Sequence, residues 1–240
     1  MGWETNWCVD LILVPLGFLM CVSYHLWLWQ KVRTQPHQTY VGLKSTVQRA
    51  WVLTMTKDNN KKDMIAVQSV RNALMGSTLM ASTSIVLSTG LAALLSSTYS
   101  IKKPLNSTIY GSPDEHVAAI KYVCLLTIFL FAFLCYSLSI RFLGQFGFLV
   151  NVPRRNEDEN NPATLEYVCV LLEKGFGLNT IGNRIFFSGM PLLLWIVGPI
   201  LVFLCYVCMT VILYNVDVVT YNGKTGSREF VDENCATATL

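Results

Sequence analysis

The sequence contains few charged residues. Asp, Glu, Lys and Arg make up 14% of the 240 residues, whereas hydrophobic residues make up 52%. A soluble domain carries about 25% charged residues, and the mean hydropathy of +0.44 also argues against one. The apolar residues gather in four runs that are long enough to cross a bilayer, at about 9–29, 73–95, 122–143 and 187–214. We therefore predict an all-α integral membrane four-helix bundle with amphipathic cytoplasmic helices.

The sequence also lacks the motifs of common enzymes. It has no HExxH zinc motif, nucleophile elbow, P-loop, dinucleotide-binding glycine fingerprint or EF-hand loop. Its three histidines, His25, His37 and His116, are too scattered for a di-iron site. A net charge of +3 without a basic-aromatic strip argues against nucleic acid as a partner. We expect no catalytic residue, no metal and no cofactor.

The basic residues predict an orientation, because Lys and Arg concentrate in cytoplasmic connections. The N-terminal tail has none, whereas the first connection has eight and the third has five. We predict that residues 30–72 and 144–186 are cytoplasmic, in the plasma membrane or an endomembrane, and that both termini are outside or luminal. The second connection is then also outside, and it contains the only N-x-S/T sequence, at Asn106, which we predict as a glycosylation site.

Two of the cytoplasmic segments have apolar residues at helical spacing. Residues 40–56 mix apolar side chains with Lys and Arg, which predicts an amphipathic helix. Residues 163–174 are expected to form a helix that packs beneath the bundle or lies on the inner leaflet. Together the spans and these helices form one membrane domain, residues 1–217, followed by a polar tail, residues 218–240.

The second span contains seven hydroxyl side chains between Ser77 and Thr89. On a helical wheel six of them fall into two stripes, because successive residues are 100° apart. The first stripe is predicted to pack against other helices and consists of Ser77, Ala81, Ser84 and Ser88. The second is either a further packing face or the lining of a hydrated path and consists of Thr78, Ser82 and Thr89.

Three polar pairs lie at the predicted cytoplasmic ends of the spans. They are Arg71 with Asn72, Arg141 with Gln145, and Asn183 with Arg184. Cations at such positions commonly extend to the headgroups as anchors. Alternatively, the three pairs converge on an anion or on a lipid headgroup phosphate.

Prolines interrupt two of the predicted spans. Pro15 lies in the first span, and Gly198 and Pro199 lie in the fourth. A proline removes a backbone donor and bends a helix. These positions are therefore predicted as packing kinks, with a hinge or an unwound ion-binding segment as the alternative.

Three segments resemble an uncharacterised family of plant and bacterial membrane proteins, domain of unknown function 599. They are Arg71-Asn72-Ala-Leu-Met-Gly-Ser-Thr, Arg141-Phe with Phe148-Leu-Val-Asn151, and Gly175-Phe-Gly-Leu-Asn-Thr-Ile-Gly-Asn183-Arg184 with Gly198-Pro199. The resemblance covers about residues 7–217 and implies a multi-span membrane protein from a land plant. The family has no established activity, so the resemblance transfers no catalytic residue.

These observations favour an oligomeric channel or transport component. The hydroxyl-rich second span, the interrupted first and fourth spans and the cationic residues at one membrane level support this hypothesis. The alternative is a non-catalytic scaffold or auxiliary subunit of a larger membrane complex, which the small-residue surface and the lack of any charge pair within the spans favour. The expected partners are the lipid bilayer and either further copies of the chain or another membrane protein.

Overall fold

The computed structural model describes residues 3–57, 62–101, 113–150 and 162–218. The elements are α1 (Trp3–Thr34), η1 (Pro36–Gln38), α2 (Tyr40–Lys57), α3 (Lys62–Ile101), α4 (Pro113–Val150), α5 (Pro162–Leu193), η2 (Leu194–Ile196) and α6 (Pro199–Asp217). The described part of the chain contains no strand, only an isolated bridge between Thr39 and Val218. The predicted all-α class is therefore confirmed.

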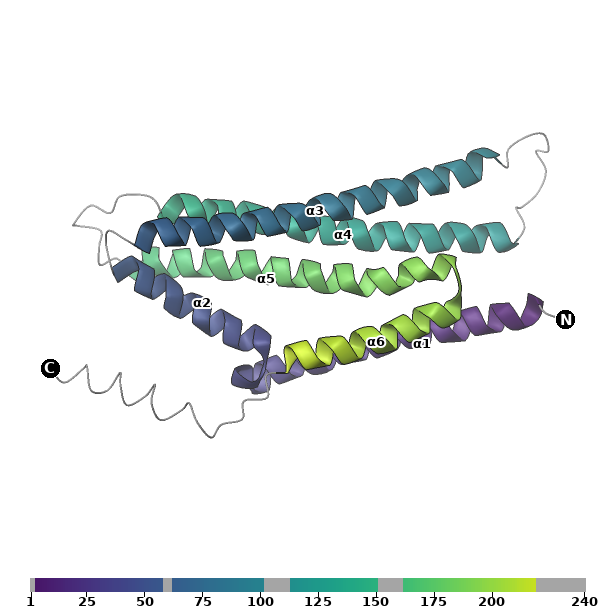
Figure 1. Cartoon of the computed structure of the whole chain (residues 1–240), viewed down its shortest axis with the longest axis horizontal. Helices are drawn as coiled ribbons and strands as arrows, with labels where there is room; N and C mark the ends of the chain where they lie inside the picture. Colours follow the sequence, from purple (N-terminus) through teal and green to yellow (C-terminus); the bar gives the residue numbers. More distant parts are fainter. Residues whose placement is uncertain (1–2, 58–61, 102–112, 151–161, 219–240) are drawn as a thin grey trace.

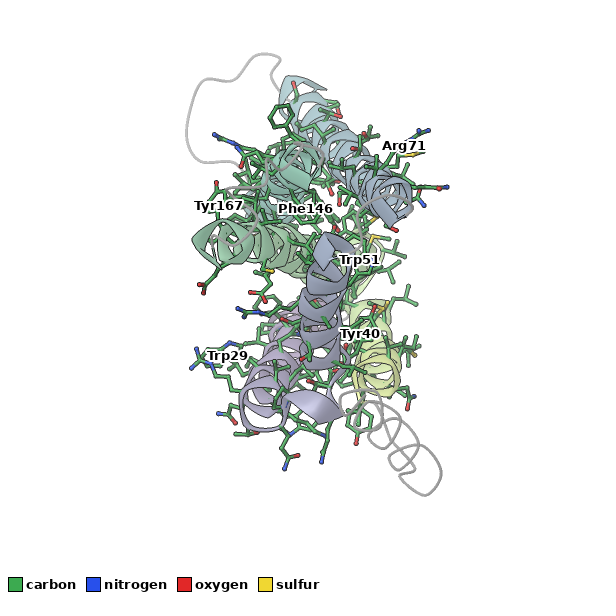
Figure 2. The ribbon with its side chains drawn as sticks, turned by 90° about the vertical axis from the view of Figure 1, so that its left-hand side faces the viewer. Trp29, Tyr40, Trp51, Arg71, Phe146 and Tyr167 are labelled. Carbon is green, nitrogen blue, oxygen red and sulfur yellow. The ribbon has the colours of Figure 1, made fainter. Side chains whose placement is uncertain are left out.

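The helices form two groups (Figure 1). α3, α4 and α5 lie side by side as one layer, and α1 and α6 form a pair next to that layer. α2 crosses one end of the bundle obliquely, and we refer to this end as the α2 end. Viewed from it, α2 reaches from the α1–α6 pair to the three-helix layer, where Trp51 lies beside Phe146 with ring centroids 6.4 Å apart (Figure 2).

Four helices contain a segment that is long and apolar enough to cross a membrane. The segments are Ile12–Thr34, Val67–Ser97, Ala119–Leu149 and Pro199–Asp217. The protein is therefore an integral membrane protein, as predicted. α5 has no segment that is apolar enough, yet its 32 residues run alongside α4 (Figure 1).

The predicted fourth span, 187–214, is not one helix. α5 ends at Leu193, and α6 starts at Pro199 and runs back in the opposite direction (Figure 1). Pro199 has no N–H to donate and disfavours helical geometry at the preceding residue. Gly198 is accordingly extended, with φ 174° and ψ 152°. Gly198 and Pro199 therefore lie at the turn of a helix hairpin, whereas Pro15 lies inside the continuous helix α1.

This reversal changes the expected placement of the chain ends. With residues 187–214 counted as one crossing, the sequence predicted four crossings and therefore both termini on the same side of the membrane. In the structure α6 ends at the α2 end, where Val218 bridges to Thr39, whereas α1 starts at the opposite end (Figure 1). The start of α1 and the end of α6 thus lie at opposite ends of the bundle.

The two predicted cytoplasmic helices have different outcomes. A helix forms where the first was predicted, α2, but its apolar residues do not share one buried face, since Val52 is buried whereas Leu43 and Val47 are exposed. Residues 163–174 do not form a separate helix but the first turns of α5. There Val168 and Leu172 are buried in a cluster that also contains Val52 and Phe146. The α2 end therefore has a packed core of its own.

Glycines let α5 lie close to α4. A Cβ atom on Gly182 would lie 3.0 Å from Cε1 of Tyr136, and one on Gly189 would lie 2.8 Å from Cγ2 of Ile128. In lipid, where apolar burial gives little net driving force between helices, such close packing supplies much of the stabilisation. The central core at this contact includes Phe129 and Tyr136, both fully buried.

Candidate functional site: a buried ion pair and two cavities

α5 accepts hydrogen bonds from the helices around it. The donor–acceptor pairs are Ser77 Oγ to Asn179 Oδ1 (3.3 Å), Tyr136 OH to Asn183 Oδ1 (2.7 Å), Ser139 Oγ to the Gly175 carbonyl (2.7 Å) and Tyr206 OH to the Ser188 carbonyl (3.0 Å). Polar groups inside a membrane bundle need such partners, because lipid offers none. The polar residues of α5 are thus positioned by α3, α4 and α6.

Arg184 of α5 and Asp217, the last residue of α6, form a buried ion pair. Nη1 of Arg184 donates to Oδ2 of Asp217 over 2.5 Å, and Nη2 donates to Oδ1. The hydroxyl of Tyr24 on α1 also donates to Oδ2, over 2.6 Å. The side chains are 18% exposed for Arg184 and 1% for Asp217. Both carboxylate oxygens therefore have partners, and three helices meet at this pair.

The sequence did not predict this pair. The expectation that the spans contain no charge pair was wrong, because Asp217 was assigned to the last position before the polar tail and not paired with Arg184. Arg184 was expected at the cytoplasmic start of a span that the structure divides. An acidic residue that directly ends an apolar run was the available signal, but its partner lies 33 residues earlier in the chain.

A cavity of about 370 Å³ lies beside the ion pair, between α1, α4 and α5. Arg184, His25 and Ser188 form its polar end, and Phe18, Val22 and Ile128 belong to its apolar wall. The His25 ring is fixed by Nδ1, which lies 2.7 Å from the Cys21 carbonyl oxygen. We refer to this space as the α1–α5 cavity.

A second cavity, of about 520 Å³, lies between η1, α2 and α5. Its polar lining includes Lys44, Glu173 and Thr180. Burial lowers the pKa of Lys44 below 10.5, and its Nζ lies 5.1 Å from the centroid of the Phe176 ring. We refer to this space as the α2–α5 cavity.

The two cavities follow one another along one face of α5. Thr180 lines the α2–α5 cavity, whereas Arg184 and Ser188 line the α1–α5 cavity. Residues four apart lie on the same helix face, one turn after another. Arg184 of the ion pair therefore lines one cavity, one helical turn away from Thr180, which lines the other.

The two stripes of the second predicted span have different environments in α3. The residues of the first stripe are buried; they are Ser77, Ala81, Ser84 and Ser88. The members of the other stripe are exposed and line neither cavity; they are Thr78, Ser82 and Thr89. Their hydroxyls do not require a hydrated path, since that of Thr78, for example, donates to the Leu74 carbonyl over 2.8 Å.

The three polar pairs at the span ends do not converge on one site. The exposed members are Arg71, Asn72, Arg141 and Gln145. Figure 2 shows Arg71 at the outer edge of α3, away from Trp51 and Phe146. Asn183 and Arg184 lie inside the bundle instead, bonded to Tyr136 and Asp217.

The remaining predicted positions add no further site. Asn106 lies outside the described residues. Within the described ranges, no group of three or more His, Cys, Asp or Glu side chains could hold a metal ion. The cysteines described there are free, including Cys205 and Cys208.

Comparison with known proteins gives one match. No curated protein and no solved structure matches the chain. The family model described as "Protein of unknown function, DUF599" matches residues 12–221, which include the ion pair and both cavities. The chain therefore belongs to the DUF599 family of proteins of unknown function.

Proposed function

We propose that this protein is a membrane transport component whose path follows the face of α5 with Thr180, Arg184 and Ser188. The observation that carries the proposal is the buried Arg184–Asp217 pair, whose Arg184 lines one cavity one helical turn away from Thr180, which lines the other. Ionisable side chains are costly inside a membrane protein, and they usually face a solute or ion path. A scaffold needs only its outer surface and does not require this arrangement.

In this proposal the ion pair is the closed gate of the path. A solute that passes from the α2–α5 cavity to the α1–α5 cavity has to move past Arg184. Opening requires the end of α6 to move away from α5, because Asp217 holds the guanidinium at both carboxylate oxygens. Tyr24 and the Thr39–Val218 bridge restrain that end of α6. The hinge at Gly198 and Pro199 lies at the far end of the same helix.

We further propose five membrane crossings, with the N-terminus outside and the end of α6 in the cytoplasm. α5 supplies the fifth crossing because it runs alongside α4 (Figure 1). The α2 end carries Lys31, Arg33 and Arg49, and basic residues favour the cytoplasmic side. Epitope tags at the two termini should become accessible from opposite sides of sealed vesicles. Accessibility from the same side would refute the fifth crossing.

Oligomerisation is proposed to occur through the outward face of α3. Gly76, Thr83 and Gly90 are exposed there at intervals of seven residues, and a Cβ on either glycine would meet no atom within 4 Å. Small residues allow close approach of a second helix. This surface also supports the second candidate function, a scaffold that binds another membrane protein.

Flux in liposomes tests the transport proposal. The purified protein would be reconstituted and assayed for anion and proton flux and for osmotic uptake of neutral solutes. Replacing the ion pair with a neutral pair, Arg184→Gln with Asp217→Asn, should change flux at least about tenfold, because each 1.4 kcal/mol changes a rate by that factor. Arg141→Gln, at an exposed position, is the matched control.

The outcomes separate the two candidate functions. Equal flux in the wild type and in a folded double variant would refute the proposed path. Absence of flux, together with a membrane protein that co-purifies with the wild type but not with Gly76→Leu, would favour the scaffold. Flux that is lost in both Gly76→Leu and Ser82→Leu would instead place the path between protomers.

A further inference from the structure

His25, which lines the α1–α5 cavity, has a buried nitrogen atom without a hydrogen-bond partner, Nε2. It is the only such side-chain nitrogen or oxygen in the part of the chain that the structure describes. Nδ1 lies 2.7 Å from the Cys21 carbonyl, which can only accept, so this contact assigns a proton to Nδ1. In apolar surroundings the neutral ring is favoured, which leaves Nε2 as an acceptor. A buried acceptor without a donor is costly and points to a missing partner.

The other polar groups of the cavity already have partners. The guanidinium of Arg184 is neutralised by Asp217. Ser188 Oγ donates to the Arg184 carbonyl over 2.7 Å and lies 3.5 Å from Cys21 Sγ. The cavity therefore has no uncompensated charge that would select an anion or a cation. The group that still lacks a partner is Nε2 of His25, which needs one neutral hydrogen-bond donor.

The rest of the cavity is apolar and arranged along the membrane normal. Phe18 lies about two turns before His25 on α1, whereas Trp27 and Trp29 follow His25. Tryptophans at the end of a span indicate headgroup depth. The acceptor therefore lies near the headgroups, and the apolar wall extends toward the bilayer centre. A volume of about 370 Å³ is at the lower end of ordinary ligand sites.

We infer that the α1–α5 cavity binds a neutral, apolar molecule with a hydroxyl group that donates a hydrogen bond to His25 Nε2. The inference rests on the proposed function, because it names the class of substrate that would bind in the same cavity. The hydroxyl can belong to a bilayer lipid, such as a sterol or a diacylglycerol, or to a smaller free alcohol. The recognition chemistry is the same for both sources: one O–H donor on an apolar body.

Photolabelling of the full chain in nanodiscs tests this inference. The probe is a medium-chain alcohol with a diazirine on its chain, and the control probe is its methyl ether, which cannot donate. In the wild type the alcohol should label α1 and α5 around the cavity about tenfold more efficiently than the ether, the factor expected for one hydrogen bond. Equal labelling by the two probes would overturn the inference without any variant.

Variants then test the residue assignment. His25→Phe keeps a ring but removes the acceptor, so the preference for the alcohol should disappear, and a retained preference would overturn the assignment. Val22→Trp fills the cavity and should block labelling, whereas Val86→Trp, at a 65% exposed position on α3, should not. If His25→Phe does not fold, Val22→Trp and the comparison of the two probes in the wild type decide the question.

Competition identifies the source of the hydroxyl. Loss of labelling on addition of a sterol or a diacylglycerol assigns the site to a bilayer lipid, and loss only with a short free alcohol assigns it to a small molecule. The alcohol preference is measured at equilibrium and does not depend on flux. Binding without flux would therefore refute the proposed function alone, and flux without an alcohol preference would refute this inference alone.

Discussion

Removing the carboxylate of Asp217 should strongly destabilise the protein. Asp217→Ala leaves the guanidinium of Arg184, which is only 18% exposed, without its counter-charge. Breaking a buried pair by removing one partner costs about 3–5 kcal/mol, because the remaining charge stays desolvated. For a chain of this length each kcal/mol corresponds to about 2–4 °C in melting temperature. We therefore expect the melting temperature to fall by about 6–20 °C.

Tryptophan fluorescence in nanodiscs provides a local assay. Trp27 stacks on Tyr214 with ring centroids 5.8 Å apart, one turn before Asp217 on α6. Arg49→Gln is the matched control, since it breaks the exposed Arg49–Glu173 contact, in which the side chains are 53% and 35% exposed and 4.0 Å apart. Such surface pairs contribute about 0–1 kcal/mol.

The double variant separates charge burial from packing. Arg184→Gln with Asp217→Asn removes both charges and keeps similar side-chain volumes, so it should be more stable than either single variant. Replacing a complete buried pair with neutral groups is often neutral in free energy. The explanation is wrong if Asp217→Ala lowers the free energy of unfolding no more than Arg49→Gln does. It is also wrong if the losses of the single variants Arg184→Gln and Asp217→Asn add up in the double variant.

Three further predictions, made with four substitutions, can be checked in the same melting assay. Tyr24→Phe should cost about 1.5–3 kcal/mol, because it removes a hydrogen bond to a charged group; a loss similar to that of Arg49→Gln would argue against this bond. Gly182→Leu should destabilise by about 1–3 kcal/mol through overpacking against Tyr136, whereas Gly76→Leu should leave the single chain as stable as the wild type. Burial lowers the pKa of Lys44 below 10.5, so the unfolded chain retains this proton at pH values where the folded chain has lost it. Stability should therefore rise as the pH increases through the interval between the lowered pKa and 10.5, and Lys44→Met should abolish that rise.

The features that could be predicted from the sequence depend on local periodicity. The apolar runs indicated membrane helices because hydrocarbon thickness fixes the required length. The buried stripe of α3, with Ser77 and Ser84, followed from helical geometry alone. The hydroxyls of the other stripe were harder to interpret, because a threonine such as Thr78 can bond to the preceding turn of its own helix.

The features that the sequence did not reveal depend on non-local partners. α5 resembled a cytoplasmic segment because hydropathy counts Glu173, Lys174 and Arg184 against a membrane location. Arg184 is tolerated there because Asp217 neutralises it from another helix. Likewise, Gly198 and Pro199 signalled an interruption, but a kink and a complete reversal have the same local signature. Only the packing of α6 against α1 distinguishes them.

The order of the two charged residues in the chain has a consequence for biogenesis. Arg184 leaves the ribosome 33 residues before Asp217, which corresponds to a delay of about 2–7 s at ordinary rates of synthesis. During this interval α5 is a poorly hydrophobic helix whose Arg184 lacks its counter-charge, with only the hydrogen bonds from α3 and α4 to hold it. The last apolar helix of the described chain therefore completes the insertion of the helix before it. A premature stop codon just ahead of Asp217 would leave the apolar length of α6 almost intact, yet it should direct the nascent protein to membrane quality control.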